Sequence, residues 1–154
     1  MKAGMNSEQE ILEQLKESGH RFTGKRKEVI DLFIEYKDRY LTAKDVYEHV
    51  EKVYPSISHD TIYRTLALLE QEHLIEELEY GDEACRYRLS CGPEHHHHLV
   101  CLGCGATKVL HGCPMEFMEI DQEDFTVVNH RFEIFGYCST CRLSGRGQEG
   151  GGQK

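Results

Sequence analysis

Two pairs of cysteines constrain this chain more than any other feature. They are Cys101 with Cys104 and Cys138 with Cys141, each pair separated by two residues. That spacing lets two thiolates bind one ion from a tight turn, and two pairs complete the four-thiolate set of a structural zinc site. The alternative is two disulfides, which the absence of a secretory signal disfavours, because cytosolic thiols stay reduced. The segment between the pairs is longer than in common zinc ribbons, so the fold must bring them together.

A run of four histidines, His95 to His98, precedes the first cysteine pair. It continues into an apolar pair that predicts a strand, in which successive side chains point to opposite faces. We therefore expect His96 and His98 on one face and His95 and His97 on the other. One strand can then serve two metal sites. The alternative is a solvated histidine loop.

Length and charge limit the class of protein. The 154 residues have room for one large or two small domains, and no stretch is apolar and long enough to cross a membrane. The net charge of −9 is unusual for a nucleic-acid-binding protein. Between Lys16 and Lys27, however, five basic residues face a single acidic one. Because phosphate contacts are local, this basic edge could bind DNA, with weak non-specific affinity.

Helical patterns fill the first half of the chain. A capping box begins a helix at Ser7, and further apolar stripes predict helices over about 25–36, 42–55 and 58–70. Two strands, 75–80 and 84–89, follow around a Gly-Asp turn. This order is typical of a winged helix-turn-helix, whose last helix enters the major groove. A plain helical bundle with its charges on a solvated face is the alternative.

The second half predicts a small α/β unit. Strands are expected over 107–110, 125–128 and 131–137, with a short helix beginning at Cys113 and Pro114. A sheet this small is marginal alone, which favours pairing with a second copy. The fold class is therefore α+β: an N-terminal winged helix-turn-helix domain plus a small C-terminal α/β dimerisation domain with a four-cysteine zinc site. The expected boundaries are 1–89 for the DNA-binding domain, 90–143 for the dimerisation and metal-binding domain, and 144–154 for a disordered tail.

These residues resemble the ferric uptake regulator family of metal-responsive repressors. The resemblance rests on residues 60–64 of the expected recognition helix, on 95–104 and on 130–141. Within the family, residues 40–44 and 58–64, the segment from Cys113 to Met115, and Cys91 with its histidines are most similar to the zinc uptake regulator branch.

The resemblance implies three zinc sites and a DNA-binding face. Cys101, Cys104, Cys138 and Cys141 would hold structural zinc. Glu76, Cys91, His96 and His98 would form the sensing site, and His95, His97, Glu116 and His130 an additional site in the dimerisation domain. Expected DNA contacts are Arg21, Lys25, Arg26, His59, Thr61, Tyr63 and Arg64. Cys85 is expected to be a small core residue, and Cys113 has no assigned role.

The implied function is a homodimeric, cytoplasmic, zinc-responsive repressor of zinc-uptake genes, which binds a palindromic double-stranded operator with zinc as corepressor. Since zinc accepts thiolates more readily than iron or manganese does, Cys91 favours zinc sensing. The nearest alternative is an iron- or peroxide-sensing repressor of the same family. A zinc-storage or chaperone protein would leave the DNA-binding helix without a role. A zinc hydrolase lacks a recognisable general-base motif, so we do not expect an enzyme.

Overall fold

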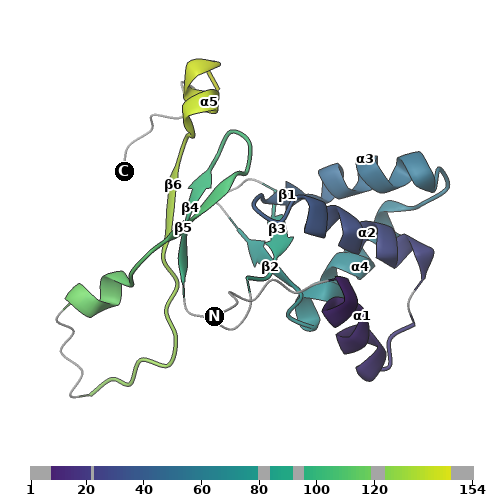
Figure 1. Cartoon of the computed structure of the whole chain (residues 1–154), viewed down its shortest axis with the longest axis horizontal. Coiled ribbons are helices and arrows are strands. Elements are labelled where there is room, and N and C mark those ends of the chain that lie inside the picture. Colours follow the sequence, from purple (N-terminus) through teal and green to yellow (C-terminus); the bar gives the residue numbers. More distant parts are fainter. Residues whose placement is uncertain (1–7, 22, 80–83, 92–95, 119–123, 147–154) are drawn as a thin grey trace. The chain divides into compact units, whose positions relative to one another are not determined.

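The computed structural model describes residues 8–21, 23–79, 84–91, 96–118 and 124–146. The chain divides into two compact units, Met1–Glu94 and His95–Lys154 (Figure 1). The fold is α+β, and among the described residues four of the five α-helices lie in the first unit. Each unit is built around its own three-stranded sheet.

Four helices make up most of the described residues of the first unit. They are α1 (Glu8–Glu17), α2 (Gly24–Glu35), α3 (Ala43–Val53) and α4 (His59–Gln71). Three of them begin at a side chain that caps the first turn: Thr23 accepts a hydrogen bond from the Arg26 amide, Thr42 forms a full capping box with Asp45, and Ser58 accepts from the Thr61 amide. The predicted capping box at Ser7 lies outside the described residues.

The wing follows α4. Its strands are β2 (Ile75–Leu78) and β3 (Arg86–Leu89), which pair antiparallel, and the predicted turn between them lies outside the described residues. A third strand, β1 (Leu41–Thr42), pairs with the other edge of β3, so β3 is the central strand. The sequence did not predict β1, because two residues are too short for a recognisable alternation. Helices followed by this sheet confirm the winged helix-turn-helix.

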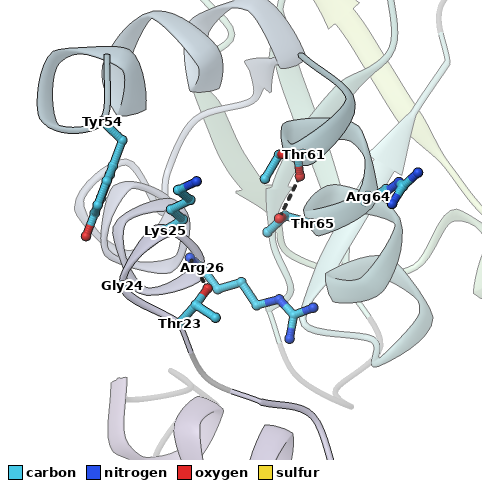
Figure 2. A pocket seen from close by; sticks show the side chains of 8 residues that line it. All are labelled: Thr23, Gly24, Lys25, Arg26, Tyr54, Thr61, Arg64 and Thr65. Carbon is cyan, nitrogen blue, oxygen red and sulfur yellow. Dashed lines mark hydrogen bonds between the residues drawn. The ribbon is translucent and has the colours of Figure 1, made fainter. Parts of the chain in front are cut away.

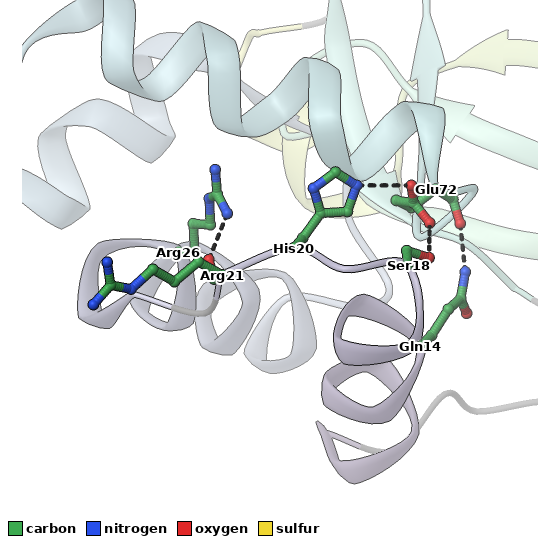
Figure 3. Close-up of polar contacts among 6 residues, drawn as sticks. All are labelled: Gln14, Ser18, His20, Arg21, Arg26 and Glu72. Atoms are coloured by element: carbon green, nitrogen blue, oxygen red, sulfur yellow. Dashed lines mark hydrogen bonds and ion pairs between the residues drawn. The ribbon is translucent and has the colours of Figure 1, made fainter.

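Apolar stripes from all four helices meet in one core. Phe33 and Val46 are fully buried, and Leu15 and Leu66 are nearly so. Polar contacts tie the end of α1 to the end of α4 (Figure 3): the side chains of Gln14, Ser18 and His20 all bond to Glu72. The Ser18 hydroxyl donates at 2.6 Å and, with His20, lowers the pKa of the Glu72 carboxyl despite the opposing effect of burial. These contacts hold the end of α1 against the end of α4, although the residues lie far apart in the sequence.

The second unit holds a smaller sheet. It consists of β4 (His97–Cys101), β5 (Thr107–Leu110) and β6 (Glu133–Gly136) in the order β5-β4-β6, with β4 and β6 parallel. A short 3-10 helix, η1 (Pro114–Phe117), follows β5, and α5 (Ser139–Leu143) follows β6.

The prediction of a strand over 125–128 was wrong. The segment is not a strand, and Phe125 and Val128 are 70% and 93% exposed. An extended segment becomes a strand only when a neighbour accepts its backbone hydrogen bonds. The alternation of apolar residues alone supplies no such neighbour within one chain.

Candidate metal and nucleic-acid sites

The four paired cysteines converge in the second unit. Cys101 ends β4, Cys104 lies in the following turn, Cys138 caps α5 and Cys141 lies within that helix. Their sulfur atoms all lie within 4.8 Å of one another, and the Sγ atoms of Cys104 and Cys138 are 3.8 Å apart. Thiolates bound about 2.3 Å from a tetrahedral zinc lie about 3.8 Å apart. The cluster therefore fits a structural zinc site.

Backbone amides of this cluster stabilise a negatively charged thiolate. The Cys138 amide donates to Cys101 Sγ at 3.2 Å. Burial raises the pKa of the Cys101 thiol. Hydrogen bonds from the amides of Cys138, Cys104 and Gly103 have the larger combined effect and lower this pKa to about 6. Burial and the neighbouring thiols raise the pKa of Cys141 to about 12. Four thiols cannot all ionise so close together unless a cation joins them.

A glycine makes room for the cluster. A Cβ at position 103 would lie 2.8 Å from Cys141 Sγ and 2.9 Å from Cys141 Cβ. Any larger residue would push α5 away from the turn that carries Cys104. In the sequence, the only sign of this close approach is the glycine between Cys101 and Cys104.

A second cluster of the same unit contains a residue that the sequence did not assign. Cys113 Sγ lies 3.4 Å from His97 Nε2 and 3.1 Å from His130 Nε2. His97 is buried, and the two imidazole rings are 5.3 Å apart between centroids. Two imidazoles and a thiol are suitable ligands for zinc. Glu116, the carboxylate expected here, is exposed on η1 and is not part of this cluster.

Cys113 could not be found from spacing, because no second cysteine lies near it in the sequence. Its only local signal is the proline that follows it and begins η1. His95, also expected at this site, lies outside the described residues.

The residues expected in the sensing site belong to both units. In the second unit, the imidazole rings of His96 and His98 lie edge to face, with centroids 4.9 Å apart and ring planes at 83°. His98 is buried, as is its neighbour His97. Because successive side chains alternate along β4, His98 contacts His96 while His97 contacts His130.

In the first unit, Cys91 follows β3 and is half-buried. Burial raises the pKa of its thiol, and the nearby Glu76 carboxylate adds to this, although Arg88 acts in the opposite direction. The guanidinium of Arg88 donates to Cys91 Sγ at 2.6 Å. Glu76 lies on β2 and accepts a hydrogen bond from the Ser90 hydroxyl at 3.3 Å.

The exposed face of α4 carries the expected DNA contacts. Tyr63 is 57% exposed, and the exposed Arg64 side chain forms an ion pair with Asp60 one turn before it at 2.9 Å. On the same helix Ile62, Leu66 and Leu69 are buried. His59 stacks on Tyr47 of α3, with ring centroids 3.8 Å apart. The helix thus has one face fixed in the core and one that presents polar groups.

A hollow of about 520 Å³ lies between the start of α2 and α4 (Figure 2). Lys25 and Arg26 line it from the first turn of α2, and Thr61 lines it from α4. The guanidinium of Arg26 also donates to the Arg21 carbonyl (Figure 3). Helix N-termini and basic side chains both attract phosphate. The neighbouring Lys27 is different: hydrogen bonds with Asp31 and Glu8 raise its pKa and engage its charge.

Comparison with known proteins agrees with this arrangement. A sequence model described as the Ferric uptake regulator family matches residues 17–135. The Ferric uptake regulation protein of Staphylococcus epidermidis is 39% identical over 128 residues, which cover 83% of this chain and 91% of that protein.

Solved structures have the same fold. The Helicobacter pylori ferric uptake regulator superposes with a TM-score of 0.67 at 23% identity, covering 92% of this chain and 97% of that one. A zinc-bound manganese uptake regulator superposes with a TM-score of 0.62 at 30% identity, covering 83% and 98%. Among the described residues, no helix is apolar and long enough to span a membrane. The chain belongs to the ferric uptake regulator family of metal-responsive transcriptional regulators.

Proposed function

We propose that this chain is a zinc-responsive repressor that binds operator DNA when its sensing site holds zinc. The observation that carries the proposal is the half-buried thiol of Cys91 at the end of the wing. Thiolate and imidazole ligands favour tetrahedral zinc, whereas iron and manganese sites use imidazole and carboxylate ligands in higher coordination. The protein would act in the cytoplasm, and the genes that it represses would be those for zinc uptake.

The proposed sensing ligands are Cys91, His96 and His98, with Glu76 as the carboxylate. One thiolate, two imidazoles and a carboxylate match the donor set of a four-coordinate zinc site. Bound zinc would supply a fixed bond between the residue that follows the wing and the strand that begins the second unit. A ligand shifts a conformational equilibrium only if it binds one arrangement better than the other. Bridging the two units gives zinc that preference.

The structural zinc would be held by Cys101, Cys104, Cys138 and Cys141. For the additional site we propose His97, Cys113 and His130, in place of Glu116; His95 stays a candidate. The short distances from Cys113 Sγ to both imidazoles support this change.

DNA recognition is proposed to use α4 in the major groove. Tyr63 and Arg64 would contact base edges or phosphates there, with His59 and Thr61 beside them. Arg21, Lys25 and Arg26 would contact the backbone at the start of α2. A homodimer would present two such helices to the halves of a palindromic operator.

An iron-sensing repressor is the second candidate, because curated relatives such as the Staphylococcus epidermidis protein are named for ferric uptake regulation. The Cys91→Ser variant separates the two. A hydroxyl is a poor zinc ligand, so this variant should lose zinc-dependent operator retardation and one zinc per monomer, yet keep its structural zinc. Cys85→Ser is the matched control, since Cys85 packs against the core. An unchanged zinc response of Cys91→Ser would contradict the proposal.

A further inference from the structure

Arg88 is a buried cation in the first unit. It lies on the central strand β3 and is only 4% exposed. Within the described residues, its Nε and Nη1 atoms have no hydrogen-bond partner. Buried guanidinium groups normally have their donors satisfied, and an unpaired buried charge is strongly unfavourable. The position of this charge therefore needs a reason.

The surroundings of the guanidinium supply it. Nη2 lies 2.6 Å from Cys91 Sγ, and Cζ lies 5.7 Å from the centre of the Tyr40 ring. Across the sheet, Glu76 on β2 stands directly opposite Arg88 in the strand register. Opposite charges at such positions usually pair. Instead, Glu76 accepts a hydrogen bond from Ser90, and two donor atoms of Arg88 have no partner among the residues that the structure describes.

Cys91 and Glu76 are also the two ligands that the first unit contributes to the proposed sensing site. We propose that Arg88 is a resident cation of the metal-free site and that the regulatory metal must displace its guanidinium from Cys91. This inference rests on the proposed function. The sulfur cannot keep so close a contact with a guanidinium and also bind a divalent ion without placing like charges a few ångströms apart. In a buried site that repulsion is only weakly screened.

Two consequences follow for regulation. Arg88 raises the free-metal concentration at which the site fills, because the metal has to overcome the repulsion. Displacement also moves a side chain of β3, which pairs with both β1 and β2. Binding of the metal would thereby change the side-chain contacts of β3, the central strand of the sheet that forms the wing.

The test is an Arg88→Met variant of the full chain, which removes the charge and keeps much of the side-chain length. Zinc affinity at the sensing site is measured by competition with a chelating dye after the structural zinc has been loaded, and binding to the additional site is subtracted with a parallel titration of Cys91→Ser. We expect about tenfold tighter binding than in the wild type, because the like charge has gone. Arg88→Lys keeps a charge and should bind more weakly than Arg88→Met. Arg86→Met, on the same strand but half-buried, is the matched control and should leave the affinity unchanged. Equal or weaker binding by Arg88→Met would overturn the proposal.

A second measurement uses the wild type and does not depend on the folding of a variant. In nuclear magnetic resonance spectra of arginine side chains, the Nε–H signal of Arg88 should shift and exchange faster with water when zinc is added. A signal that is unchanged at full zinc occupancy would overturn displacement.

The outcomes separate this inference from the proposed function. If iron or manganese fills the site instead of zinc, and Arg88→Met still binds that metal more tightly, the zinc proposal fails and the role of Arg88 stands. If zinc binds the wild type as proposed but the affinity does not depend on Arg88, the zinc proposal stands and the role of Arg88 fails. If neither protein binds any of the three metals beyond the structural ion, both fail.

Discussion

Replacing Cys138 by Ser should unfold the second unit while the first stays folded. Among the described residues of that unit, the buried apolar side chains are Val100, Cys101 and Cys141, and two of these belong to the cysteine cluster. Burying one valine contributes only about 1.5–3 kcal/mol. Ordering the backbone opposes folding by about 1–2 kcal/mol for every residue. Apolar burial within one copy therefore cannot stabilise this sheet.

Structural zinc can supply the difference. Four-ligand sites contribute about 10–16 kcal/mol of binding free energy, which in small domains is folding free energy. A whole domain is stable by only about 5–15 kcal/mol, so losing one of four thiolates should be enough to unfold the unit.

Hydrogen exchange measured by mass spectrometry tests this prediction. In Cys138→Ser, peptides covering β4, β5 and β6 should exchange at the rate of an unfolded chain, while α3 and α4 keep their protection. Cys85→Ser controls for the loss of a thiol elsewhere. Wild-type protection of β4 in Cys138→Ser would refute the reasoning.

Three further predictions concern the first unit. Arg64→Ala should weaken operator retardation without changing zinc content, because the side chain is exposed and buries nothing in the core; unchanged affinity would show that this face of α4 does not meet DNA. Thr42→Ala should lower the free energy of unfolding by about 1 kcal/mol in a denaturant titration, since it removes the capping box with Asp45; no change would mean that solvent satisfies the helix end equally well. Glu72→Gln should have a lower free energy of unfolding than the wild type at neutral pH. This difference should disappear as the pH falls below about 4, because the pKa of Glu72 is lowered in the folded state and the carboxyl stabilises the fold only while it is ionised. A gap that is constant from neutral pH to acid would exclude this linkage.

Local patterns predicted the helices well. Thr42 and Ser58 are recognisable in the sequence as caps, and each begins its helix as expected. The alternation of side chains along a strand also predicted that His98 and His97 point to opposite faces, and their different ring contacts agree with this. These features depend on residues close together in the sequence, where spacing alone decides which side chains share a face.

Long-range contacts were not predictable in the same way. The pairing of β1 with β3 depends on two residues, and the approach of Cys113 to His97 and His130 depends on how η1 follows the sheet. Arg88 is the clearest case. Its neighbours Tyr87 and Leu89 are buried too, so β3 is covered on both faces and alternation does not reveal which side chains are exposed.

The most direct test of zinc sensing is operator retardation by the wild-type protein across buffered series of free zinc, iron(II) and manganese(II). The structural zinc is loaded beforehand, and Cys91→Ser is measured in parallel to separate the response of the sensing site from that of the additional site. We predict retardation at the lowest free concentration with zinc, together with one additional zinc per monomer in the retarded complex. Retardation that follows iron(II) at concentrations where zinc has no effect would contradict the account.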